Sequence, residues 1–231
     1  MRHLAIIPDG NGRWAKSHDL PVGKGHERGA IAVTKVIEDF CSLPIDVLTI
    51  YALSRDNLKR DREEVGNLHG VIAYFLSHDI ARIAEQNGLK IRIIGDLSLF
   101  PDEFAEVLSG LNARFLNGSG KTVVIAVGYG GRAEIKAAVD RILDRRRFLD
   151  DYSPVTDEEL DANLFTAGLP APDAVLRYGG YHRLSDFMPL QTTYSELFFV
   201  DKFWPDYERT DIESVIDEFS RIKRNFGGRH D

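Results

Sequence analysis

The chain has 231 residues, of which 43% are hydrophobic and 28% are charged, and its formal net charge is −7. This length favours one domain, residues 1–231, with one buried core, and the negative charge offers no basic field to attract nucleic acid. A single cysteine, Cys41, excludes an internal disulfide framework and lies in an apolar run, so we expect a buried structural thiol. No apolar run approaches the roughly 20 residues that span a bilayer. No signal peptide precedes the first polar turn. We therefore expect a cytoplasmic protein without a transmembrane segment.

Short apolar runs rich in β-branched residues alternate with amphipathic segments along the whole chain. Six runs, each bounded by Gly, Pro or Asp, predict strands at residues 3–8, 46–53, 90–96, 122–129, 173–180 and 196–201. Apolar residues near the helical period predict helices at 62–88, 102–116, 133–149, 157–165 and 211–224, the last with a glycine C-cap at 226–228. This alternation predicts an α/β fold: a central, mostly parallel sheet of about six strands with helices on both faces.

Polar, glycine-rich and arginine-rich turns follow the predicted strands. In parallel sheets of this kind, ligands bind outside the carboxyl ends of the strands. The turns to inspect are therefore residues 8–14, 54–60, 95–96, 129–132 and 177–185. Their composition predicts a functional site at that edge of the sheet.

The first of these turns, "PDGNGRWA", matches the dinucleotide pattern G-x-G-x-x-A directly after a strand. The second strand, however, ends on Ala52-Leu53-Ser54 without the acid that a ribose requires, and Asp9 would repel a pyrophosphate. Asp9 fits better with a divalent cation between it and a phosphate, with Gly10 and Gly12 admitting the anion and Arg13 donating to it. The turn alone leaves open a second interpretation, a tight turn in which Asp9 caps a helix.

Five further motifs follow in order: "GHERG" at 25–29, "YALSRDNLKRDREEV" at 51–65, "IIGD" at 93–96, "YGGRAEI" at 129–135, and "RYGGYHRLSDF" with "YSELFFVDKFWPDY" between 177 and 207. With His3 to Ala15, they make nearly the whole chain resemble the cis-prenyltransferases, typified by undecaprenyl diphosphate synthase. The resemblance implies that an allylic diphosphate loses pyrophosphate while its C1 is attacked by the double bond of another isoprenoid diphosphate. It also implies Mg²⁺ dependence, a homodimer, and an apolar tunnel for the prenyl chain.

The same resemblance assigns roles to residues. Asp9 would hold the metal and assist departure of the allylic diphosphate, and Glu196 would be a second metal ligand reaching across from the late segment. Ser54 and Asn57 would lie near the condensing carbons, with Asn57 handling the proton, although direct transfer to pyrophosphate is equally open. The allylic diphosphate would be bound by Gly10, Asn11, Gly12, Arg13, Trp14, His26 and Arg60. The second diphosphate would be bound by Arg177, Arg183 and Ser185.

Several of these residues have structural alternatives. His26 could cap a helix, Trp14 could pack in the core, and Arg60 could belong to a solvated charged face. Arg132 and Glu134, which flank a predicted helix start, are expected to be structural.

The chain also departs from the family pattern. Val22 replaces an arginine before the Gly-His pair, and Asp56 and Leu58 replace a glutamate and a tryptophan. Tyr178 and Tyr181 replace a threonine and a carboxylate, and we expect both tyrosines to lie beside the acceptor site and to change how the second substrate lies. Some family members that make lavandulyl or cyclolavandulyl skeletons similarly have a proline after the second arginine.

These departures favour a short C10–C15 product from dimethylallyl, geranyl or isopentenyl diphosphate. They point to irregular head-to-middle coupling of dimethylallyl diphosphate. The alternatives are regular elongation with isopentenyl diphosphate to a longer polyprenyl chain, a non-catalytic binding subunit, and an unrelated nucleotide-binding protein. Retention of Asp9, Asn57, Arg183 and Glu196 argues against a non-catalytic subunit.

Overall fold

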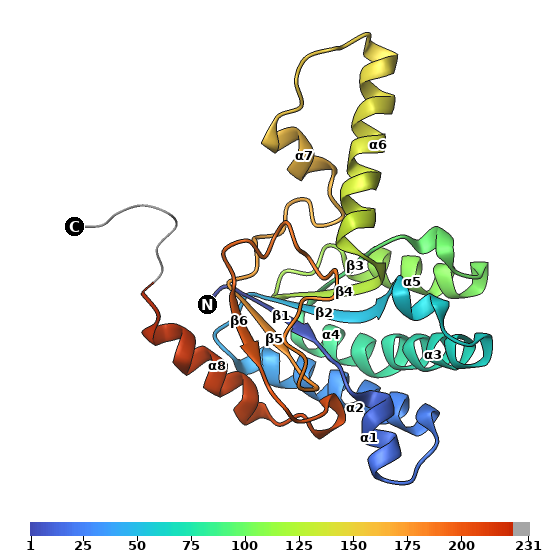
Figure 1. Cartoon of the computed structure of the whole chain (residues 1–231), viewed down its shortest axis with the longest axis vertical. Helices are drawn as coiled ribbons and strands as arrows, with labels where there is room; N and C mark the ends of the chain where they lie inside the picture. The colour runs from blue at the N-terminus through green and yellow to red at the C-terminus, as the bar shows by residue number, and fades with distance from the viewer. Residues whose placement is uncertain (224–231) are drawn as a thin grey trace.

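The computed structural model describes residues 1–223, which form one six-stranded sheet with the order β3-β4-β2-β1-β5-β6 (Figure 1). Every neighbouring pair of strands is parallel, which confirms the predicted sheet. The strands are β1 (His3–Ile7), β2 (Val47–Ser54), β3 (Lys90–Ile94), β4 (Thr122–Tyr129), β5 (Ala174–Arg177) and β6 (Glu196–Phe199).

The helices confirm the five predicted segments to within a few residues and add two more. They are α1 (Asn11–Ser17), α2 (Val22–Ser42), α3 (Arg62–Phe75), α4 (Ala81–Asn87), α5 (Asp102–Phe115), α6 (Gly131–Leu149), α7 (Asp157–Asn163) and α8 (Arg209–Arg221). The segment predicted as one helix at 62–88 contains a π-helical turn, η2 (Leu76–Ile80), between α3 and α4, and it ends at Gly88 with φ 63°. The predicted C-cap at 226–228 lies outside the described residues.

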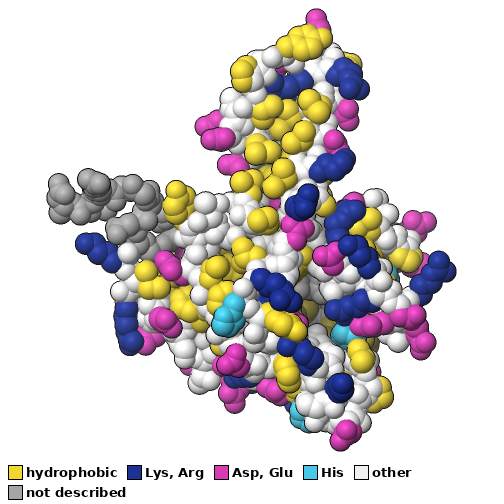
Figure 2. Space-filling view, viewed as in Figure 1, with side chains coloured by type: hydrophobic (Ala, Val, Ile, Leu, Met, Phe, Trp, Pro, Cys, Tyr) yellow, Lys and Arg dark blue, Asp and Glu magenta, His cyan; other side chains and the backbone are white. Residues whose placement is uncertain are grey.

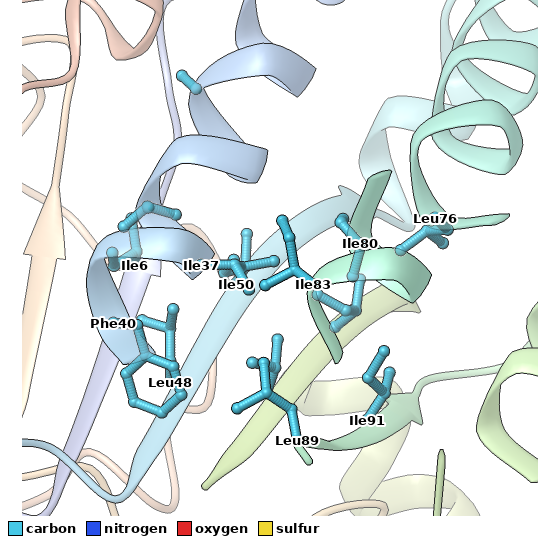
Figure 3. Close-up of a cluster of buried hydrophobic side chains, with 14 of the residues drawn as sticks. Ile6, Ile37, Phe40, Leu48, Ile50, Leu76, Ile80, Ile83, Leu89 and Ile91 are labelled. Atoms are coloured by element: carbon cyan, nitrogen blue, oxygen red, sulfur yellow. The ribbon is translucent and has the colours of Figure 1, made fainter. Parts of the chain in front are cut away.

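The strand residues alternate between two hydrophobic clusters because successive side chains of a strand point to opposite faces. Leu4 and Ile6 of β1 belong to the larger cluster, and Ala5 and Ile7 belong to the smaller one. Figure 3 shows the larger cluster, in which Ile37 of α2 and Ile83 of α4 lie over the strands. Helices therefore cover this face of the sheet, as predicted.

The opposite face is covered largely by connecting segments. Its cluster combines strand residues with Phe165, Leu169, Leu184, Phe187 and Met188, which lie in connecting segments, and within residues 1–223 it includes no helical residue. Connecting segments thus supply much of this layer, and α6 reaches it through buried Glu134, which accepts from the Tyr129 hydroxyl. Aromatic side chains also fill this layer, since Phe187 stacks on Tyr51 with ring centroids 4.5 Å apart.

Helices α6 and α7 form an arm that projects from the body of the molecule (Figure 1). The start of α6 is fixed by Asp186, whose backbone oxygen accepts from the Gly131 N–H at 2.7 Å and whose carboxylate accepts from the Arg132 N–H at 3.1 Å. The Pro189 ring fills the space that a Cβ at position 131 would need. Within the described part of the chain, no helix is long and apolar enough to cross a membrane.

Candidate active site

The carboxyl ends of β1, β2 and β5 open onto a cavity of about 600 Å³. All the predicted site residues except Trp14 and Glu196 line it: Asp9, Gly10, Asn11, Gly12, Arg13, His26, Ser54, Asn57, Arg60, Arg177, Arg183 and Ser185. The turns after these three strands therefore meet at one place, as expected for the carboxyl edge of a parallel sheet.

Asp9 does not cap a helix. Gly10, with φ 107°, is the N-cap of α1, and no side chain caps that helix. The Asp9 carboxylate instead pairs with two guanidiniums, at 2.9 Å from Arg177 Nη2 and 3.1 Å from Arg13 Nη2. The structure thus rules out the capping interpretation and places Asp9 among cations at the cavity.

Arg177 and Arg13 join separate segments around Asp9. The Arg177 side chain is 4% exposed, and its Nη1 donates to Ser185 Oγ at 2.8 Å and to the backbone oxygen of Arg183. Arg13 Nη1 donates to the Gly179 backbone oxygen at 2.7 Å. The loop after β5 is therefore held against the first turn of the chain by charge-assisted hydrogen bonds.

His26 lies in the second turn of α2, whose N-cap is Pro21, so the interpretation of His26 as a helix cap is wrong. Burial lowers its pKa, which leaves the imidazole largely neutral at pH 7. Its Nε2 lies 3.2 Å from Glu64 Oε1, and its Nδ1 is buried with no partner among residues 1–223. Since the carboxylate accepts from Nε2–H, Nδ1 carries a lone pair and can accept a hydrogen bond.

Glu64 is a cavity residue that the sequence analysis missed. Its carboxylate pairs with Arg60 Nη1 at 2.9 Å as well as with His26, so it orients two predicted diphosphate ligands at once. The helical i,i+4 rule could not identify this pair, because Arg60 precedes both the predicted helix at 62–88 and α3.

Ser54 and Asn57 hold each other through the backbone. The Ser54 N–H donates to Asn57 Oδ1 at 3.0 Å, and the Asn57 N–H donates to Ser54 Oγ at 3.1 Å. These bonds close the short turn η1 (Asp56–Lys59). Asn57 Oδ1 is therefore already engaged as an acceptor, which makes the amide a still weaker base.

Trp14 and Tyr178 lie outside the cavity, as does Glu196. Trp14 is buried and donates from Nε1 to Asp206 Oδ1 at 2.7 Å, so its indole packs rather than lining the cavity. Tyr178, expected beside the acceptor site, is buried in the larger cluster and donates to Asp211 Oδ2 at 2.9 Å. Of the two unusual tyrosines, only Tyr181 lines the cavity.

The structure does not bring Glu196 to Asp9 within one copy of the chain. Glu196 begins β6 and is level with Ala174, which is level with Leu4 near the start of β1. Asp9 follows the other end of β1, about 15 Å further along the strand direction. Among residues 1–223, no cluster of three or more His, Cys, Asp or Glu side chains suits a metal.

A second cavity, of about 80 Å³, adjoins the first, because Pro8, Asn11, Ala52 and Leu68 line both. Its remaining walls are apolar apart from backbone atoms: Gly29, Ala30, Val33, Ile72, Phe75, Leu76, Ile80, Ile125 and Trp204. A charged cavity thus borders a small apolar one, which suits a ligand with a polyanionic head and a hydrocarbon tail.

The family described as "Putative undecaprenyl diphosphate synthase" matches residues 7–227. The chain is 38% identical to an isoprenyl transferase of Rhodopirellula baltica over 98% of this chain and 93% of that protein. It is 37% identical to isoprenyl transferase 2 of Bradyrhizobium diazoefficiens over 98% and 90%.

Two solved structures are similar over almost their whole length. Lavandulyl diphosphate synthase from Lavandula x intermedia, in complex with dimethylallyl diphosphate, has a TM-score of 0.94 and 29% identity, with 98% of each chain covered. A probable undecaprenyl diphosphate synthase from Campylobacter jejuni has a TM-score of 0.80 and 27% identity, with 99% of each covered.

Proposed function

Because the chain belongs to the undecaprenyl diphosphate synthase family of isoprenyl transferases, we propose that it joins dimethylallyl or geranyl diphosphate to a second C5 isoprenoid diphosphate, with release of pyrophosphate. The observation that carries the proposal is Asp9, held between Arg13 and Arg177 in the charged cavity that adjoins the apolar one. With the family shown, an unrelated nucleotide-binding protein is set aside, and the enzymatic relatives argue against a non-catalytic subunit.

The size of the apolar cavity supports a short product. An engineered protein cavity of roughly 150 Å³ holds one benzene molecule. The cavity of about 80 Å³ next to Asn11 and Leu68 is therefore no larger than a five-carbon group requires. Phe75 and Trp204 are bulky wall residues that would stop a longer chain. We expect a C10 product from a dimethylallyl donor, with C15 as the upper bound.

Irregular coupling of two dimethylallyl diphosphates is the favoured regiochemistry. Tyr181, where the family pattern has a carboxylate, lies in the cavity beside Arg177 and Arg183 and alters the space for the second substrate. The resemblance to the lavandulyl diphosphate synthase backbone, with a TM-score of 0.94, supports the same choice. Regular elongation with isopentenyl diphosphate is the second candidate, because the similar curated proteins are named isoprenyl transferases.

Asp9 suits a magnesium ion, which in proteins takes one or two carboxylates and completes its shell with water and substrate phosphate oxygens. The Asp9 side chain is 29% exposed at the cavity, so it can reach both solvent and ligand. Glu196 does not fit as its companion within one copy. When bound, the ion would stabilise the negative charge that develops on the departing pyrophosphate.

The chain's own groups would bind and orient the two diphosphates. Arg60 and the neutral His26 line the cavity with Arg177, Arg183 and Ser185. Arg13 lies beside Arg177, since both pair with Asp9. The engaged Asn57 amide leaves the pyrophosphate oxygen as the acceptor of the proton that the condensed product loses. Fixed guanidiniums around that oxygen lower the energy of the charge it carries before protonation.

We also expect a homodimer formed through the arm. Figure 2 shows hydrophobic side chains gathered along α6 and α7, and the exposed ones include Val139, Leu143, Phe148, Leu149 and Tyr152. Contiguous exposed apolar surface on this scale marks an interface. Leu143→Glu should convert a dimer into a monomer in sedimentation velocity, whereas a monomeric wild-type protein would contradict the proposal.

The deciding experiment is incubation of the protein with Mg²⁺ and dimethylallyl diphosphate alone, followed by mass spectrometry and pyrophosphate detection. A C10 branched diphosphate supports irregular coupling. Product formation that requires isopentenyl diphosphate supports regular elongation instead. Absence of pyrophosphate with every donor and acceptor pair would refute the transferase assignment. Asp9→Ala serves as the inactive control.

A further inference from the structure

Three arginines surround Tyr181: Arg177 and Arg183 lie near it in the sequence, and Arg13 comes from the start of the chain. The distances from its ring centroid to the guanidinium carbons are 4.1 Å for Arg183, 4.5 Å for Arg13 and 5.7 Å for Arg177. All three lie within the roughly 6 Å over which a cation is attracted to an aromatic face. Arg13 belongs to α1, Arg177 ends β5, and Arg183 follows in the next loop, so one side chain links three segments.

Arg183 depends on this ring more than the other two do. Arg177 and Arg13 each pair with Asp9 and donate to backbone or hydroxyl oxygens. Within the part of the chain that the structure describes, the Arg183 guanidinium has no hydrogen bond or ion pair, and the Tyr181 ring is its close neighbour. A long arginine side chain without such a contact would occupy many rotamers, and ordering it on binding would reduce affinity.

An aromatic ring holds these cations without neutralising them. Four arginines and three carboxylates line the cavity, so its charged groups leave an excess of positive charge for an anion. A carboxylate at position 181 would cancel that excess and would accept the N–H groups that a phosphate needs. The ring attracts the guanidiniums through its face, which leaves the N–H edges available to donate.

We propose that Tyr181 is a positioning residue for diphosphate binding. Its ring orders Arg183 and packs against Arg13 and Arg177, so the three guanidiniums are in place before the diphosphate binds. This inference rests on the proposed function in that the ligand is an isoprenoid diphosphate. It adds that the ring, rather than the hydroxyl, sets the affinity for the diphosphate group. Tyr181 is 41% exposed, so its replacement should leave the fold intact.

The test compares Tyr181→Leu with Tyr181→Phe by calorimetric titration with inorganic pyrophosphate, using Tyr74→Leu as the control. Tyr74 is also exposed, at 57%, but lies on α3 away from the cavity lining. Loss of the ring should weaken pyrophosphate binding about tenfold, because cation–π contacts at exposed sites are individually modest and three are lost. Tyr181→Phe and Tyr74→Leu should bind within twofold of the wild type. In the steady state, Tyr181→Leu should raise the KM for the diphosphate substrates more than it lowers kcat, with Tm unchanged.

Each outcome separates this inference from the proposed function. Wild-type affinity in Tyr181→Leu, or equal losses in Tyr181→Leu and Tyr181→Phe, would overturn the role of the ring even if condensation proceeds. Absence of pyrophosphate binding by the wild type would overturn it as well. Ring-dependent pyrophosphate binding in a protein that condenses no isoprenoid diphosphate would support the positioning role and refute the transferase proposal.

Discussion

Gly25 of α2 lies against the first turn of α1, and alanine there should disturb the site without touching a ligand. A Cβ at position 25 would lie 2.8 Å from the Asn11 carbonyl carbon, closer still to its oxygen, and 3.0 Å from Ala15 Cβ. Ordinary contact begins at 3.4 Å. Because the obstacle is backbone, α1 must shift by about 1 Å rather than rotate a side chain away.

The expected effect on stability is moderate, and the effect on turnover is large. Overpacking of this kind costs about 1–3 kcal/mol, which for a chain of this size lowers Tm by roughly 2–12 °C. Helix α1 carries Asn11, Gly12 and Arg13 into the cavity. A displacement of about 1 Å in positioning groups can reduce the rate about 100-fold. We therefore expect kcat/KM to fall by about two orders of magnitude at a temperature where the variant is fully folded.

Gly23→Ala is the matched control, because Gly23 lies one half-turn earlier in the same helix and a Cβ there meets nothing within 4 Å. It should retain kcat/KM within about twofold and keep or slightly raise Tm, since alanine favours helix over glycine. Pyrophosphate release and thermal unfolding measure both quantities. Wild-type turnover in Gly25→Ala, or an equal loss in Gly23→Ala, would refute the close-packing argument.

Three further outcomes are expected. Asp9→Asn should reduce pyrophosphate release more than about 100-fold and lower Tm, because buried Arg177 loses its anionic partner; an active variant in the release assay would contradict this. Phe75→Ala should widen the apolar cavity and shift the product towards C15 when geranyl diphosphate is supplied, and mass spectrometry should then differ from the wild type. Burial lowers the pKa of His3 to about 4, so between pH 6.5 and 4 the unfolded chain takes up a proton that the folded chain does not. The free energy of unfolding should therefore fall by about 2 kcal/mol from pH 7 to pH 4.5. In His3→Gln, the free energy of unfolding measured by urea denaturation should not show this part of the pH dependence.

The sheet and the site turns could be predicted because their signals are local. Each strand is a short apolar run, and the residue that follows a parallel strand lies at one edge of the sheet whatever the rest of the chain does. Helix α2 was missed as an element because Gly23, Gly25 and Gly29 weaken its helical pattern. Gly25 and Gly29 record a contact with α1, which no local rule reveals.

Tyr178 and Glu196 show where such reasoning stops. Tyr178 directly follows a strand, yet its ring lies in the larger cluster with Leu176, two residues earlier, because alternate residues of a strand share one face. Its hydroxyl donates to Asp211 of α8. Glu196 belongs to the same run of motif residues as the cavity arginines, but it begins its strand instead of ending it. The strand predicted at 196–201 already begins at Glu196. The rule that ligands bind at the carboxyl ends of strands would therefore have placed Glu196 at the other edge of the sheet. Its assignment to the site came from the family resemblance.

The π-helical turn Leu76–Ile80 contributes Leu76 and Ile80 to the wall of the apolar cavity. Such a turn accommodates one residue more than a regular helix does, and one residue corresponds to a rotation of about 100° around the helix axis. Deleting a single residue there would straighten the helix and swing Leu68, Ile72 and Phe75 together to new directions. Length changes at one point, rather than substitutions at several, could thus have remodelled the hydrocarbon end of the pocket while the phosphate end stayed intact.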